Sequence, residues 1–223
     1  MIISIVVVTH LESNKKYLDS CLQSIANQTL SPDKYETIVV SSGEYQPSLA
    51  KWCKGVHVDT RMHYPEAVNY GVKHTDPKSK YLLILNDDTI LTKESISNML
   101  MGLGDSQIIL NPLSNCDNHF MYNLILGYER NGQFETMNKR FYRYDEWEKI
   151  QPNLMNARSI YPPGIVARDF VCFYATIIPR SVWNKVGELD PNFKTGQDDV
   201  DYCRRAKKLG IASGVALQSI IWL

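Results

Sequence analysis

Short apolar segments rich in strand-forming residues recur along the first half of the chain. They are residues 2–8, 37–40, 56–59, 81–85 and 107–110. Their apolar residues are continuous rather than alternating, which is typical of strands covered on both faces, as in a parallel sheet. Parallel neighbours need a crossover connection, and segments with helical spacing lie between these runs. The pattern therefore predicts an α/β fold with a mostly parallel sheet flanked by helices.

Helical periodicity and end signals place the other elements. The first predicted helix starts near residue 13 or 14 and carries one apolar stripe, formed by Leu18, Cys21, Leu22 and Ile25. A later helix is predicted to have Thr92 as its N-cap and Gly104 as its stop. The remaining predicted elements are helices at residues 65–74, 92–103 and 198–209, and strands at residues 170–178 and 215–223.

The length of 223 residues and the hydrophobic content of 44% are sufficient for one sizeable domain. We predict a single domain over residues 1–223, with α/β alternation up to residue 110 and a second ordered part at 170–223. Residues 111–169 have poor periodicity and scattered aromatic residues, so they are predicted to be a variable insertion. Because the chain ends on an apolar run, we also expect it to be truncated within its domain.

Charge and cysteine content limit the classes of partner. Lys plus Arg and Asp plus Glu number 24 each, so no overall field attracts nucleic acid or an anionic membrane. No segment approaches the roughly 20 apolar residues that cross a bilayer, so any membrane association is expected to be peripheral. The five cysteines include no C-x-x-C pair, which argues against a disulfide framework and a zinc ribbon. We expect a cytoplasmic location, with the inner face of the membrane as an alternative.

Two pairs of aspartates are the candidates for chemistry. Asp87 and Asp88 directly follow the apolar segment 81–85, at the sheet edge where open α/β sheets bind ligands. Such a pair suits a divalent cation that also binds phosphate oxygens, but a turn or helix cap would use the same residues. Asp198 and Asp199 begin a predicted helix, where acids also complement the helix dipole. Each pair, taken alone, leaves the functional and the structural interpretation open.

Five motifs in order resemble the inverting family 2 glycosyltransferases of the GT-A fold, including bacterial polysaccharide and rhamnosyltransferase-like members. The resemblance covers nearly all of the chain except residues 111–169. The motifs are residues 6–10 (VVVTH), 21–28 (CLQSIANQ), 67–71 (AVNYG), 85–89 (LNDDT) and 187–204 (GELDPNFKTGQDDVDYCR). The family has Val-Val-Thr-Tyr-Asn at the first and Glu-Asp-Val-Asp within the last. The resemblance implies a nucleotide-binding half at 1–110, an acceptor-side insertion and a catalytic half at 170–223.

The resemblance also implies a role for each acid. Asp88 is expected to ligate Mn²⁺ or Mg²⁺, and Asp87 to lie against ribose or metal-bound water. Asp199 is expected to be the general base, with Asp198 in place of the usual Glu beside it. The implied donor-binding residues are Thr9, Ser41, Arg61, Asn69, Asp87 and Asp88. The implied partners are a nucleotide-diphosphate sugar and a glycan or lipid-linked saccharide acceptor.

Several features keep the substrate and rival functions open. Ser41 stands where many members have an Asp that holds the nucleotide base, and a serine supplies no carboxylate acceptor. Arg61 and Arg168 suit phosphate, although a surface ion pair explains either one equally well. The five histidines have no metal-ligand spacing and are predicted to be ordinary surface or core residues. A sugar nucleotidyltransferase would need a glycine-rich loop that residues 9–13 lack, and a non-catalytic nucleotide-sugar or glycan-binding module is the remaining alternative.

Overall fold

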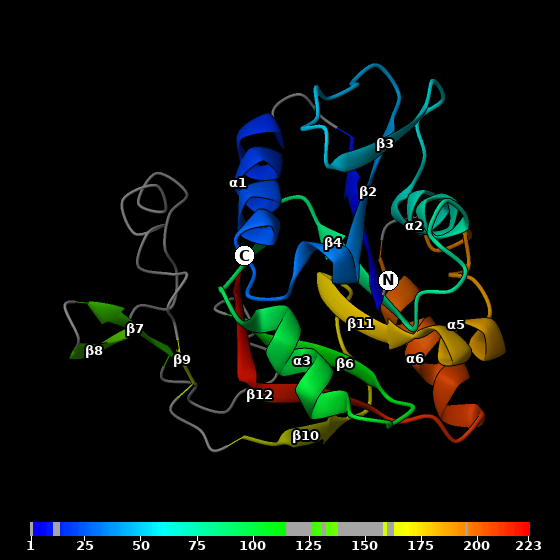
Figure 1. Cartoon of the computed structure of the whole chain (residues 1–223). Helices are drawn as coiled ribbons and strands as arrows, with labels where there is room; N and C mark the ends of the chain where they lie inside the picture. The colour runs from blue at the N-terminus through cyan, green and yellow to red at the C-terminus, as the bar shows by residue number, and fades with distance from the viewer. Residues whose placement is uncertain are drawn as a thin grey trace.

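The computed structural model describes residues 2–10, 14–114, 126–130, 133–137, 158–159, 163–194 and 196–223 (Figure 1). Within these ranges, nine strands form the main sheet. Their order is β10 (Ile165–Arg168), β12 (Ser213–Trp222), β6 (Ile109–Ser114), β11 (Ala175–Pro179), β4 (Tyr81–Asn86), β1 (Ile3–Thr9), β2 (Tyr35–Ser42) and β3 (Cys53–Val58), with β5 (Ile90–Leu91) paired to β12. A separate small sheet contains β7 (Leu126–Arg130), β8 (Gln133–Met137) and β9 (Arg158–Ser159).

Strand direction confirms the mostly parallel sheet that the sequence predicts. β1 is parallel to both β2 and β4, β2 is parallel to β3, and β6 is parallel to β12. The antiparallel members are β11, between β4 and β6, β10 at the edge, and the short β5. All seven residues of β1 are buried, as expected for a central strand covered on both faces.

Helices cover the two faces of the main sheet (Figure 1). α2 (Tyr64–Lys73), α5 (Arg180–Val186) and α6 (Asp198–Lys208) contribute Val68, Trp183 and Tyr202 to one apolar cluster. α1 (Lys15–Ala26) and α3 (Ser95–Leu103) contribute Leu18 and Met99 to the other. Successive β1 residues alternate between the two clusters, which is the period-two alternation of a strand. The sheet is therefore flanked by helices on both sides. A 3₁₀ helix at Pro32–Lys34 leads into β2.

Two sequence predictions about individual elements are wrong, and one short helix was missed. The strand predicted at 170–178 begins only at Ala175, because the preceding residues turn: the Tyr174 amide donates to the Cys172 carbonyl. Thr92 is not the N-cap of α3, because its hydroxyl donates to the Ile220 carbonyl of β12 instead, and Glu94 is at the cap. The short helix α5 was not predicted.

The predicted insertion at residues 111–169 falls largely outside the described residues. The described parts are the end of β6, the small sheet and β10. β6 reaches Ser114, so the main sheet extends into the predicted insertion. In the described part of the chain, none of the helices has the length and apolar character needed to span a membrane.

Candidate active site

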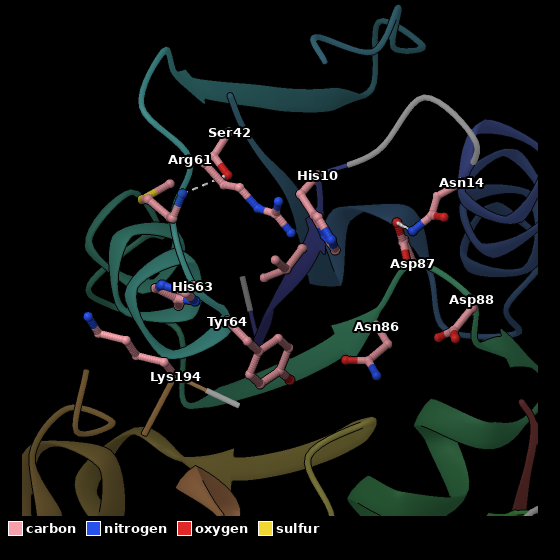
Figure 2. A pocket seen from close by; sticks show the side chains of 12 residues that line it. His10, Asn14, Ser42, Arg61, His63, Tyr64, Asn86, Asp87, Asp88 and Lys194 are labelled. Atoms are coloured by element: carbon pink, nitrogen blue, oxygen red, sulfur yellow. Dashed lines mark hydrogen bonds between the residues drawn. The ribbon is translucent and has the colours of Figure 1, made fainter. Parts of the chain in front are cut away.

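Asp87 and Asp88 lie in the turn after β4, and they line a pocket of about 340 Å³ (Figure 2). Residues from the carboxyl ends of neighbouring strands share this pocket, His10 after β1 and Ser42 at the end of β2. Parallel strands end at one sheet edge, so their following residues meet there. The Arg61 side chain enters from the segment between β3 and α2. The pocket therefore combines two carboxylates with a guanidinium.

Burial makes the charged form of both carboxyls unfavourable. Asp87 is 7% exposed, and burial raises its pKa from the ordinary 3.8, although the Asn14 amide donates to its Oδ2 at 3.1 Å and opposes this. Burial also raises the pKa of Asp88, and the neighbouring charge of Asp87 raises it further. A cation bound between the two groups would offset both effects.

The oxygen atoms of Asp87 and Asp88 suit a hard divalent cation whose other ligands come mainly from the phosphates of the bound substrate. Within the described ranges, no three Asp, Glu, His or Cys side chains form a metal cage. Mg²⁺ in particular is usually held by one or two carboxylates together with phosphates and water. Asp87 and Asp88 supply such a pair, and the buried Oδ1 of Asn86, in the same pocket, receives no hydrogen bond from the described residues. These residues therefore fit Mg²⁺ or Mn²⁺ accompanied by a diphosphate.

The second pair of acids begins α6. The chain turns sharply before it, with positive φ angles of 110° at Gly196 and 73° at Gln197. Asp198 is 6% exposed, and its Oδ2 has no hydrogen-bond partner among the described residues. Burial raises the pKa of Asp198 to about 6, and the charge of Asp199 adds to the effect. Asp199 is half-buried, and its Oδ1 accepts from the Val200 amide at 2.7 Å.

Tyr64, the first residue of α2, connects the two pairs of acids. Its side chain lines the pocket of Asp87 and Asp88. Burial raises the pKa of the Tyr64 phenol well above its usual value, and the charges of Asp198, Asp199 and Asp88 raise it further. Because Coulomb interactions weaken with distance, Tyr64 is the side chain of this pocket that is influenced by acids from both pairs, although Asp198 and Asp199 do not themselves line either hollow. Lys194, four residues before Asp198, lines the same pocket, so the loop before α6 borders it.

A hydrogen-bonded clamp holds that loop against α2. The Asn69 amide donates to the Leu189 carbonyl at 2.8 Å, and the Leu189 amide donates back to Asn69 Oδ1 at 2.9 Å. Arg205 of α6 reinforces the same region by donating to the carbonyls of Val186 and Glu188. These contacts hold the segment before α6 against both α2 and α6.

A second, larger hollow of about 710 Å³ adjoins the first, and the two share His10, Ser42 and Arg61. Its other walls come from the turn after β2, which includes Tyr45, and from Asp59 after β3. The two hollows together form one cleft along the carboxyl ends of β1, β2 and β4. That length suits a ligand with several parts.

The cleft includes some residues that the sequence implicated and leaves out others. Asp87, Asp88 and Arg61 line it. Thr9, Ser41 and Asn69 do not line either hollow. Thr9 is buried beside Asp87, the Ser41 hydroxyl lies 2.9 Å from His57 Nδ1, and Asn69 forms the clamp described above. Arg168 lies on β10 and lines neither hollow.

Sequence reasoning missed several residues of the cleft. They are His10, Asn14, Ser42, His63, Tyr64 and Lys194. His10 and His63 line the pocket, whereas the prediction that the histidines are ordinary surface or core residues stays a prediction. The position of His10 directly after a central strand was a usable signal, because ligands bind beyond the carboxyl ends of strands. Tyr64 and Lys194 carry no such signal, because only the packing of α2 and α6 brings them to the pocket.

Comparison with protein-family profiles places residues 4–162 in the glycosyl transferase family 2. The chain belongs to this family. The match includes β1 to β4 and the Asp87–Asp88 turn, and it stops before α6. A comparison with curated protein sequences found no match.

Solved structures with a similar fold are also glycosyltransferases of the GT-A type, which confirms the predicted fold class. GalNAc-T7 with UDP, GalNAc and Mn²⁺ has a TM-score of 0.69 at 11% identity, over 99% of this chain and 42% of the other. The mannosyltransferase PcManGT from Pyrobaculum calidifontis with GDP-Man and Mn²⁺ has a TM-score of 0.66 at 14% identity, over 99% and 56%. S. aureus TarS has a TM-score of 0.58 at 13% identity, over 100% and 36%. The family 2 chain thus spans about a third to just over half of these proteins.

Proposed function

We propose that this family 2 chain is a metal-dependent, inverting glycosyltransferase domain. It would transfer a sugar from a nucleotide-diphosphate donor to a hydroxyl of a glycan or a lipid-linked saccharide. The observation that carries the proposal is the position of Tyr64, in the pocket of Asp87 and Asp88 and within the electrostatic influence of Asp198 and Asp199. In this proposal, two pairs of acids that are remote in sequence would act on one bound donor and acceptor.

We assign Asp87 and Asp88 to stabilisation of the leaving group. A nucleotide diphosphate departs with additional negative charge, which the neighbouring carboxylates would oppose. A bound Mg²⁺ or Mn²⁺ neutralises this charge as a Lewis acid, which is worth several kcal/mol. Asp88, with Asp87, would hold the ion. Arg61, at the junction of the two hollows, would donate to the phosphate oxygens in the bidentate geometry that a guanidinium favours.

We assign Asp199, at the start of α6, to activation of the acceptor hydroxyl. Asp199 would accept the proton of the acceptor hydroxyl as that oxygen attacks the anomeric carbon, a role that typically contributes on the order of 10²–10⁴ in rate. Attack from the side opposite the departing diphosphate inverts the configuration of the anomeric carbon. Asp198, buried below Asp199, would stabilise the arrangement of the turn.

The similar structures support the ligand class. Two of them are named with a nucleotide or nucleotide sugar and Mn²⁺, UDP with GalNAc in one case and GDP-Man in the other. The long cleft offers one hollow for the base and ribose and a second for the diphosphate and sugar. The nucleotide base that binds most tightly in the larger hollow is the first property to determine.

The test separates binding from transfer with two variants. A panel of UDP, GDP, dTDP and CDP, with and without MnCl₂, is measured by calorimetry and by thermal unfolding. A nucleotide at 100 times its dissociation constant should stabilise the wild-type protein by about 2.7 kcal/mol. Asp88→Ala should abolish the metal-dependent binding. Asp199→Asn should bind as the wild type does but should not release nucleoside diphosphate from the matching sugar nucleotide.

Asp201→Asn is the control for a lost charge on the same turn of α6. Asp201 forms an i,i+4 ion pair with Arg205 at 2.7 Å. The Asp201→Asn variant should retain both nucleotide binding and turnover. Equal loss of nucleotide affinity in Asp88→Ala and Asp199→Asn would refute the division of roles. Metal-dependent binding without turnover in the wild type would instead favour a non-catalytic binding module.

A further inference from the structure

The Tyr64 side chain is held in one orientation. Its hydroxyl donates a hydrogen bond to the Phe173 carbonyl, in the turn before β11. The backbone at the start of α2 is fixed as well, because Glu66 Oε2 accepts from the His63 amide at 2.7 Å. The hydroxyl is thus engaged with the protein, and the ring is the part of Tyr64 that the pocket offers to a ligand. Figure 2 shows the ring projecting from α2 toward the side of the pocket that carries Asn86.

The surroundings of the ring are apolar on one side and acidic at both ends. Val8 and Met62 line the same pocket and supply apolar surface. Asp88 lies toward one end, while Asp198 and Asp199 lie close enough on the α6 side to raise the pKa of the phenol. Tyr64 is thus an aromatic surface in the pocket of the carboxylates assigned to the metal, and it shares this pocket with Lys194 of the loop before α6.

In-line displacement requires a particular order of groups. The leaving oxygen, the anomeric carbon and the attacking oxygen lie roughly on one line, with the metal at one end and the base at the other. The sugar ring would therefore occupy the space on the α6 side of Asp88, where Tyr64 and Lys194 line the pocket. Sugar rings have apolar C–H faces that pack against aromatic rings, and contacts of this size with aromatic side chains are worth about 1 kcal/mol.

We propose that Tyr64 forms the platform for the donor sugar and distinguishes a sugar nucleotide from the bare nucleotide. This inference rests on the proposed function. It makes Tyr64 a specificity-determining residue that contacts the transferred sugar, whereas Arg61, Asp87 and Asp88 contact the nucleotide diphosphate. Loss of the ring should then weaken binding of the sugar nucleotide and leave binding of the nucleoside diphosphate intact.

The experiment compares two affinities in each variant. The probes are UDP-glucose, UDP-N-acetylglucosamine, GDP-mannose and dTDP-glucose, each measured against its own nucleoside diphosphate in MnCl₂ by calorimetry. For the pair that binds the wild type most tightly, Tyr64→Leu should weaken the sugar nucleotide by about tenfold and the nucleoside diphosphate by less than about twofold. Tyr64→Phe keeps the ring and should retain the wild-type ratio of the two affinities.

Tyr70→Leu is the matched control. Tyr70 lies on the same helix, is partly buried, and its ring packs against His74 with a centroid distance of 4.4 Å rather than lining the pocket. This variant should keep the ratio even if its thermal stability falls. A second measurement does not depend on Tyr64→Leu. In proteins labelled only at tyrosine, nuclear Overhauser contacts between tyrosine ring protons and sugar protons should be present in the wild-type complex and absent in the complex of Tyr64→Phe.

The outcomes separate the two proposals. Equal weakening of both ligands in Tyr64→Leu, or no weakening of either, would overturn the role of Tyr64 while the metal-dependent binding remains. Absence of the nuclear Overhauser contacts would overturn it even if Tyr64→Leu does not fold. Failure of the wild type to bind any of the nucleotides with metal would overturn the proposed function, and the platform with it.

Discussion

Replacing Asp198 with Asn should stabilise the folded protein at neutral and alkaline pH. The Asp198 carboxyl is buried at the first turn of α6, its Oδ2 has no hydrogen-bond partner among the described residues, and Asp199 and Asp201 lie nearby. Burial disfavours the charged form most, and the two neighbouring charges add to this effect. Asn has similar size and remains neutral, so the substitution removes the penalty with little change in packing.

The magnitude follows from the difference in pKa between the folded and unfolded states. The folded pKa is about 6, and the ordinary value is 3.8. Because one pKa unit corresponds to about 1.4 kcal/mol, full ionisation of Asp198 costs the folded state at most about 3 kcal/mol. Below pH 3.8 the carboxyl is protonated in both states and there is no penalty. As the pH rises to about 6 the unfolded state ionises first, so the wild type loses stability, and the penalty is constant above that range.

Equilibrium unfolding in urea between pH 4 and pH 8 measures the effect. The free energy of unfolding of Asp198→Asn minus that of the wild type should be only about 0.6 kcal/mol at pH 4 and should rise to a plateau of at most about 3 kcal/mol by pH 8. Asp201→Asn is the control, because loss of its ion pair with Arg205 should lower stability at pH 8 by about 0.5 kcal/mol. A difference for Asp198→Asn that is negative or independent of pH would refute the reasoning.

Two further predictions concern packing and charge. Gly71→Ala should destabilise the protein by about 1–2 kcal/mol in thermal or urea unfolding, because a Cβ there would lie 2.5 Å from Val6 Cγ1 and 2.6 Å from Val40 Cγ2. Gly102→Ala, whose new Cβ meets the flexible end of Gln218 at 3.1 Å, should be neutral or slightly stabilising, and equal effects of the two would contradict the argument. Arg61→Ala should weaken nucleoside diphosphate binding in MnCl₂ by about tenfold and reduce its salt dependence, since charged hydrogen bonds are worth about 1.5–3 kcal/mol. If calorimetry shows that Arg61→Ala binds the nucleoside diphosphate as tightly as the wild type does, the phosphates do not bind at Arg61.

Local patterns were sufficient for much of the fold. The continuous apolar run at the N-terminus became β1, buried over its whole length, because a strand covered on both faces needs no polar side. The spacing of Leu18, Cys21, Leu22 and Ile25 gave α1, whose apolar stripe lies in the core. The pattern misled at residues 170–174, where apolar residues are buried in a turn, because burial alone does not specify extended backbone.

The candidate site was predictable only where a single element carries it. Asp87 and Asp88 follow a central strand, and the general rule for α/β sheets places them at the ligand-binding edge. Asp198 and Asp199 were recognisable as acids at a helix start within a longer motif. The pKa of Asp198 was not predictable, because it depends on how deeply packing against α2 and the preceding loop buries the carboxyl.

The sequence by itself determined the α/β elements, their order and the two pairs of aspartates, because periodicity and strand ends are local properties. Only the tertiary structure decided that Tyr64 and Lys194 line the pocket of Asp87 and Asp88, on the side where α2 and the loop before α6 approach it. The contacts responsible join residues far apart in the chain: Tyr64 and Phe173 are 109 residues apart, and Asn69 and Leu189 are 120. No local pattern encodes such pairs, because they form only when α2 and α6 pack on the same face of the sheet.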